Sequence, residues 1–125
     1  MAREASDKMV AVVDDDESFR AAVQRLLRSA GLSVRSFRSA EDFLEGVQRD
    51  GFGCLIADIR MPGMSGLDLQ ARLNADNCPI PIIFITAHGD EKMRLQAMRD
   101  GAVKFLAKPF DDSVLLESVR TALNS

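Results

Sequence analysis

The sequence predicts an α/β domain built on one parallel sheet of five strands, with helices on both faces. Two observations carry this prediction. Short apolar runs alternate with segments of helical periodicity along the whole chain, and most runs are apolar at every position rather than at every second one. Because 125 residues leave room for one compact domain, we expect a single doubly wound sheet, (βα)5.

The strands are expected at five apolar runs. They cover residues 9–13, 32–37, 54–57, 82–85 and 103–107. The second run is polar at alternate positions, which is typical of a strand at the edge of a sheet. The flavodoxin-like strand order 2-1-3-4-5 places this run at an edge, and we therefore expect that order.

The helices are expected in the segments that follow the strands, where apolar residues recur at helical spacing. They run from the acidic residues 14–17 to Ala30, from the capping segment 39–42 to Val47, around Leu67 to Leu73, over 90–100, and from about Asp111 to Ala122. Gly31 and Gly101 follow two of these segments, as glycine often does where a helix ends.

Composition excludes several classes of protein. The 16 Lys and Arg residues against 19 Asp and Glu give a net charge of −3, which argues against direct binding of nucleic acid. The apolar runs are too short to span a membrane, and residues 1–8 lack the apolar stretch of a secretion signal. One histidine and two cysteines exclude multi-histidine metal sites and a disulfide framework. We expect a cytoplasmic domain over 9–123, with flexible residues 1–8 before it and a linker or terminus at 124–125.

Charged and polar side chains stand at the carboxyl ends of four predicted strands, where sheets of this kind bind their ligands. Asp14 and Asp15 follow the first strand, Asp58 the third, Thr86 the fourth and Lys108 the fifth. In the expected order the first and third strands are neighbours, about 5 Å apart, so three carboxylates should crowd together. Their mutual repulsion predicts a hard divalent cation such as Mg²⁺, with Lys108 adding a fixed positive charge.

Phosphoryl transfer requires a metal ion, a lysine and a hydroxyl donor, and all three are expected around one basin at the carboxyl ends of the strands. The sequence contains no glycine-rich nucleotide-binding loop of either common type, so no bound nucleotide is indicated. The nucleophile should then belong to the protein, and a carboxylate that forms an aspartyl phosphate is the candidate.

Four segments at the predicted strand ends belong together. They are Val12-Val13-Asp14-Asp15, Asp58-Ile59-Arg60-Met61-Pro62-Gly63-Met64-Ser65-Gly66, Ile85-Thr86-Ala87 and Lys108-Pro109-Phe110. In this order they resemble the receiver domain of two-component response regulators. The resemblance extends over most of the chain, and the segment Thr86-Ala87-His88-Gly89-Asp90 is similar to the FixJ-like subgroup.

The resemblance implies a role for each site residue. Asp58 would accept a phosphoryl group from a sensor histidine kinase. Asp14, Asp15, Asp58 and the backbone carbonyl of Arg60 would hold Mg²⁺, or Mn²⁺ in its place. Thr86, Ala87 and Lys108 would bind the phosphoryl oxygens. The bond between Lys108 and Pro109 would be cis, since proline lowers the cost of that isomer.

The resemblance also implies a switch and an output. Thr86 and Phe105 would change position on phosphorylation and alter the surface formed by the fourth helix, over 90–100, and the fifth strand. This surface would form a homodimer, with Arg94, Arg99 and Lys104 facing Asp90, Glu91 and Asp100 of a second copy. A C-terminal DNA-binding output domain, outside this chain, would then control transcription.

Two alternatives remain open from the residues alone. A Mg²⁺-dependent phosphatase of the haloacid dehalogenase type would use Asp14 as nucleophile, because Asp14-x-Asp16 after an apolar strand fits its opening motif loosely. A receiver without phosphorylation, acting as a scaffold, is the second. The complete set of site residues argues against the scaffold.

Overall fold

The computed structural model describes residues 8–46, 51–78, 80–87 and 91–124. The strands are β1 (Met9–Val13), β2 (Val34–Phe37), β3 (Phe52–Ala57), β4 (Ile82–Thr86) and β5 (Lys104–Ala107). The helices are α2 (Glu17–Ser29), α3 (Ala40–Gly46), α4 (Gly66–Ala75), α5 (Glu91–Arg99) and α6 (Asp112–Leu123). Residues 1–7 of the expected flexible segment, Val47 and Asp90 of two expected helices, and His88 lie outside the described residues.

The strands form one parallel sheet in the order β2-β1-β3-β4-β5, which confirms the predicted topology. β3 lies at the centre and is buried at every position, whereas β5 at the edge is partly exposed throughout. The apolar runs of the inner strands follow from this placement, because both of their faces are covered.

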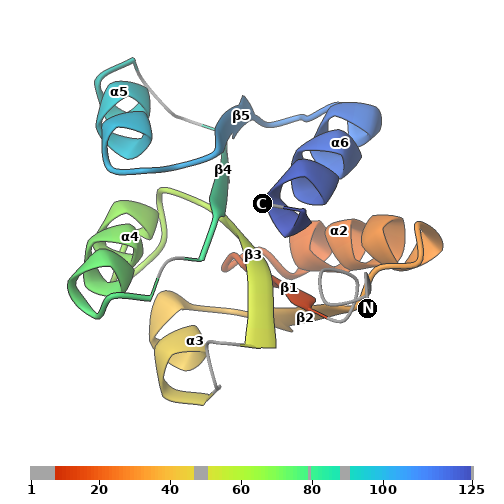
Figure 1. Cartoon of the computed structure of the whole chain (residues 1–125), viewed down its shortest axis with the longest axis horizontal. Helices are drawn as coiled ribbons and strands as arrows, with labels where there is room; N and C mark the ends of the chain where they lie inside the picture. Colours follow the sequence, from red (N-terminus) through yellow and green to blue (C-terminus); the bar gives the residue numbers. More distant parts are fainter. Residues whose placement is uncertain (1–7, 47–50, 79, 88–90, 125) are drawn as a thin grey trace.

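Helices cover both faces of the sheet, and each face has its own apolar core. Figure 1 shows α2 and α6 on one side and α3, α4 and α5 on the other. Successive residues of a strand point to opposite faces, so Ala11 and Val13 pack with α3 and α4 while Val10 and Val12 pack with α2 and α6. The carboxyl ends of all strands are left at one edge, between these two helical layers.

Four strand boundaries differ from the predicted ones. β4 extends one residue further, to Thr86, and β5 begins one residue later, at Lys104. β3 begins at Phe52 rather than residue 54, because Phe52 pairs with Met9 of β1 and packs edge-on against Phe37 and Phe43. β2 begins at Val34 rather than residue 32. The backbone N–H of Leu32 donates to the carbonyl of Leu27, so it closes the end of α2 instead of joining the sheet.

Helix ends follow the expected capping chemistry. The carboxylate of Asp16 accepts hydrogen bonds from the backbone N–H groups of Ser18 and Phe19 and so caps α2. Gly31, just after the C-terminal end of that helix, has a φ of +82°, a conformation that glycine adopts without strain. None of the helices in the described ranges combines the length and apolar character needed to cross a membrane.

Candidate functional site

Asp14 and Asp58 stand side by side because their strands are neighbours in the sheet. Each follows the last residue of its strand directly, and the backbone N–H of Asp58 donates to the carbonyl of Val13 at 3.2 Å. Both are buried, at 1% and 8% exposure, while Asp15 is exposed. One carboxylate oxygen from each of the three residues lies within 4.8 Å of the other two. The crowded basin expected from the sequence is therefore present.

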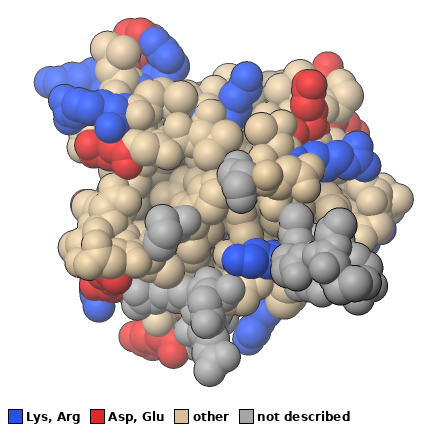
Figure 2. Space-filling model, in the orientation of Figure 1, with Lys and Arg blue, Asp and Glu red and all other residues tan. Residues whose placement is uncertain are grey.

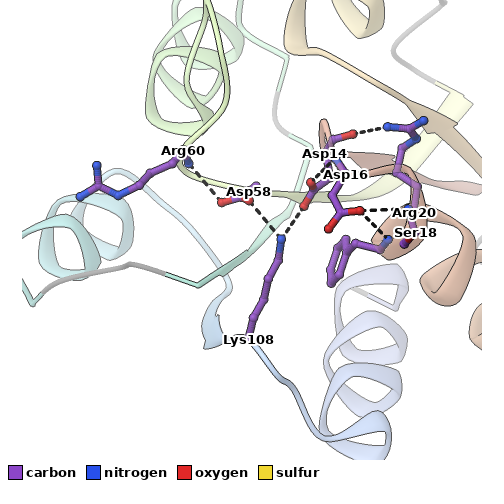
Figure 3. Close-up of polar contacts among 8 residues, drawn as sticks. Asp14, Asp16, Ser18, Arg20, Asp58, Arg60 and Lys108 are labelled. Carbon is purple, nitrogen blue, oxygen red and sulfur yellow. Dashed lines mark hydrogen bonds and ion pairs between the residues drawn. The ribbon is translucent and has the colours of Figure 1, made fainter.

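Lys108 reaches this basin from the end of β5, as Figure 3 shows. Its ammonium Nζ donates to Asp14 Oδ2 at 2.9 Å and to Asp58 Oδ2 at 3.1 Å. Its backbone N–H donates to the carbonyl of Thr86 at 3.0 Å, which holds the lysine beside β4. The peptide bond between Lys108 and Pro109 is cis.

Backbone groups hold the two buried carboxylates from the other side. Asp14 Oδ1 accepts from the N–H of Asp16 at 2.9 Å, and Asp58 Oδ1 accepts from the N–H of Arg60 at 3.1 Å. The loop after Asp58 brings Gly66 so close to the carbonyl oxygen of Asp58 that a Cβ at Gly66 would collide with it. A glycine is needed there for packing, which accounts for its place in the motif.

The charges in the basin do not balance. One ammonium faces three carboxylates, so the site keeps an excess of negative charge. Burial raises the pKa of Asp14 above its ordinary value, and hydrogen bonds from Asp16 and Lys108 offset this only in part. Burial alone would lower the pKa of Lys108, but the two carboxylates raise it by more, so the lysine stays charged.

The donor set suits a hard divalent cation. Closely spaced carboxylate oxygens, one from an exposed residue, are the ligands that Mg²⁺ takes while it keeps several waters. A divalent charge would also offset the excess negative charge that Lys108 leaves. The residues present therefore fit the metal that the sequence led us to expect.

The expected switch residues lie close to the basin along β4 and β5. Thr86 is the last residue of β4 and is buried, at 2% exposure, while Ala87 after it is exposed. Phe105 of β5 is half-buried and pairs in register with Phe84, their ring centroids 6.4 Å apart. These positions are adjacent to the site, and their movement stays a prediction.

Two residues at the site were not anticipated from the sequence. The guanidinium of Arg20 in α2 donates to the backbone carbonyl of Asp14 at 2.7 Å (Figure 3). The ring of Phe19 lies under the ammonium of Lys108, 4.1 Å from Nζ to the ring centroid. In the sequence, Phe19 belongs to the apolar positions of the helix, and no local pattern separates a core phenylalanine from one that faces a charge.

Comparison with known proteins agrees with this geometry. The family described as the response regulator receiver domain matches residues 10–120. Nodulation protein W of Bradyrhizobium diazoefficiens is 51% identical over 120 residues, which cover 95% of this chain and 53% of that protein. The transcriptional regulatory protein FixJ of the same organism is 42% identical over 112 residues, covering 90% of this chain and 55% of FixJ.

Among solved structures, that of the response regulator StyR superimposes with a TM-score of 0.88 at 50% identity, covering 94% of this chain and 59% of StyR. The chain thus spans about half the length of the curated relatives it matches. The family match extends over β1 to α6 and includes both buried aspartates, Thr86 and Lys108. On fold, site and similarity together, this chain belongs to the response regulator receiver domain family.

Proposed function

We propose that this domain is a phosphorylation-dependent switch that accepts a phosphoryl group on Asp58 from a sensor histidine kinase, in a reaction that requires Mg²⁺. The observation that carries the proposal is the meeting of three carboxylates and the Lys108 ammonium at one edge of the sheet. Membership of the receiver family supports a phosphoacceptor rather than a turnover enzyme. It thereby favours Asp58 over the phosphatase alternative with Asp14 as nucleophile.

In this proposal Asp14, Asp15, Asp58 and the backbone carbonyl of Arg60 hold Mg²⁺, and Mn²⁺ can replace it. When bound, the metal supplies positive charge next to the phosphoryl oxygens. The three carboxylates support this assignment because their oxygens lie within 4.8 Å of one another.

The transfer is a displacement at phosphorus. A carboxylate oxygen of Asp58 forms a bond to the phosphorus atom, and the bond from phosphorus to the donor's histidine nitrogen breaks, with its electron pair leaving on that nitrogen. The ammonium of Lys108, already 3.1 Å from Asp58 Oδ2, binds a phosphoryl oxygen as negative charge develops there. The Thr86 hydroxyl and the backbone N–H of Ala87 bind the others.

The new group would then move the switch residues. A phosphoryl group adds nearly two negative charges and new acceptor oxygens, toward which the Thr86 hydroxyl turns. This movement frees space beside β4, and Phe105, half-buried against Phe84, turns into it. The surface of α5 and β5 changes as a result.

That surface is the proposed homodimer interface. Leu95 and Met98 of α5 are exposed, at 55% and 37%. Figure 2 shows basic side chains gathered over α5 with acidic ones beside them. Arg94 already pairs with Glu91 of the same helix, 2.6 Å from Nη2 to Oε2, so a charged pair across the interface would have to replace this bond.

The output lies in the remainder of a longer protein. Because FixJ is named as a transcriptional regulatory protein and this chain matches 55% of it, we propose that residues 9–123 form the receiver and that a C-terminal DNA-binding domain follows. In this arrangement residues 1–8 are a flexible extension and 124–125 begin a linker. The whole protein would act in the cytoplasm.

Intact mass spectrometry after incubation with acetyl phosphate tests the proposal. One phosphoryl adduct should form with Mg²⁺, be absent in EDTA and be absent in Asp58→Asn. The adducted sample should also elute earlier in size exclusion if it dimerises. An adduct that persists in Asp58→Asn and disappears in Asp14→Asn would restore the phosphatase alternative.

A further inference from the structure

We propose that Phe19 is a positioning residue for Lys108, whose ammonium rests on the face of the phenylalanine ring. This inference rests on the proposed function, in which Lys108 binds the transferred phosphoryl group. Phe19 touches neither the phosphoryl group nor the metal in this account. It acts through the lysine alone.

The contact completes the surroundings of the ammonium. Nζ of Lys108 donates to Asp14 Oδ2 and Asp58 Oδ2, which engages two of its three N–H groups. The ring of Phe19, with its centroid 4.1 Å from Nζ, is a third close neighbour. A cation over an aromatic face at this distance is attracted by the negative charge density of the ring.

The ring itself is held in place at two points. The ring of Phe110 meets it edge-on, with centroids 5.8 Å apart and planes at 83°, and Phe110 packs against the core beneath α2 and α6. The backbone N–H of Phe19 donates to Asp16 Oδ1 at 3.3 Å, in the first turn of α2. Both contacts restrict where the ring can stand.

These contacts form a closed ring of interacting residues around the site. Asp14 Oδ1 accepts from the N–H of Asp16, and the Asp16 carboxylate accepts from the N–H of Phe19. The ring of Phe19 supports Lys108, and Lys108 donates to Asp14 Oδ2. A displacement of the first turn of α2 would therefore disturb the buried carboxylate and the lysine together.

An aromatic face suits this position better than the alternatives. A further carboxylate would neutralise the ammonium and compete with the phosphoryl oxygens for its N–H groups. An aliphatic side chain would fill the space without attracting the charge. The ring attracts the ammonium without accepting a hydrogen bond through a lone pair, so the positive charge remains available to a phosphoryl group, and the ammonium has no directional bond to the ring to break as it turns.

The test compares Phe19→Leu, Phe19→Tyr and the matched control Phe52→Leu, which removes a phenylalanine from the other core at the far end of β3. The rate of Mg²⁺-dependent adduct formation is measured over a range of acetyl phosphate concentrations. Phe19→Leu should lower the maximal rate about three- to tenfold. Phe19→Tyr should retain the parental rate, and Phe52→Leu should leave it unchanged.

Two further readouts separate positioning from a general loss of structure. In Lys108→Ala, the second change Phe19→Leu should cause no further loss of rate, since the lysine through which it acts is gone. In the metal-free protein, ring currents should shift the Lys108 ε-methylene protons upfield, and Phe19→Leu should abolish that shift while Phe52→Leu preserves it.

Equal rates for the parent and Phe19→Leu would overturn the inference, as would the same loss with and without Lys108. Failure of the proposed function is distinguishable from this, because then the parent protein would itself carry no adduct on Asp58.

Discussion

Two regions of this domain pair their buried polar side chains in opposite ways. At the carboxyl ends of the strands, Asp14, Asp58 and Lys108 are charged and leave an excess of negative charge. Between α4 and α5 the polar groups are neutral amides. Gln70, 2% exposed, donates to the carbonyl of Ala97 at 3.0 Å, and beside it the exposed Asn74 donates to the carbonyl of Asp100 at 3.1 Å.

The amides serve stability alone. Gln70 adds a second donor to the Ala97 carbonyl in the last turn of α5, which also accepts from the backbone N–H of Ala102, and Asn74 donates to the carbonyl of the residue that follows the helix. The buried acids destabilise the fold. Burying like charges close together costs free energy, and the attraction of one lysine does not offset that cost. The contrast indicates that the acids are kept for chemistry and the amides for the fold.

Removing the cation of the charged region should change the phosphorylation rate the most. Lys108→Ala should slow phosphorylation of Asp58 by acetyl phosphate about 10²- to 10³-fold, because a positioned donor to the developing phosphoryl charge is lost. The rate of adduct formation by intact mass measures this. Lys104→Ala, a change at an exposed lysine of the strand that Lys108 follows, is the matched control. A loss below tenfold in Lys108→Ala would mean that the ammonium has no major part in the transfer.

In the neutral region, a substitution should lower the unfolding free energy and leave the phosphorylation rate unchanged. Gln70→Leu removes the side-chain hydrogen bond to the Ala97 carbonyl, which still accepts from the backbone N–H of Ala102, so the change should cost about 0.5–1.5 kcal/mol of unfolding free energy. Urea unfolding measures it against Gln96→Leu, an exposed change on α5. The phosphorylation rate of Gln70→Leu should equal that of the parent. A rate that fell with stability would show that the two regions are coupled.

An effect of similar size and opposite sign is expected when a negative charge is removed from the acidic site. Without metal, Asp58→Asn should be more stable than the parent by about 1 kcal/mol, since repulsion between carboxylates falls. Mg²⁺ at 100 times its dissociation constant should stabilise the parent by about 2.7 kcal/mol, and the variant by less. Urea unfolding with and without Mg²⁺ gives both values. A less stable variant in EDTA would contradict the charge imbalance.

The sequence predicts the features that follow from the order of strands and helices along the chain. The strand order follows from apolar runs with one polar run, and the meeting of Asp14, Asp58 and Lys108 follows because parallel strands end at the same edge. The capping of α2 by Asp16 is predictable too, because it involves only residues that are close in the sequence.

Contacts between side chains of different helices are not predictable in this way. Gln70 resembles any helical glutamine until its helix packs against α5. Arg20 binds a backbone carbonyl, which every residue carries, and Phe19 meets Lys108 only because α2 and the end of β5 are brought together. These contacts depend on how the layers pack.

The decisive experiment locates the phosphoryl group on the chain. Borohydride reduction of the acetyl phosphate-treated protein converts an aspartyl phosphate into homoserine, which exchanges one oxygen for two hydrogens at the modified residue. Peptide mass mapping should find homoserine in place of Asp58 in samples treated with Mg²⁺, and unmodified Asp58 in samples treated with EDTA. Homoserine in place of Asp14, with Asp58 intact, would contradict the account.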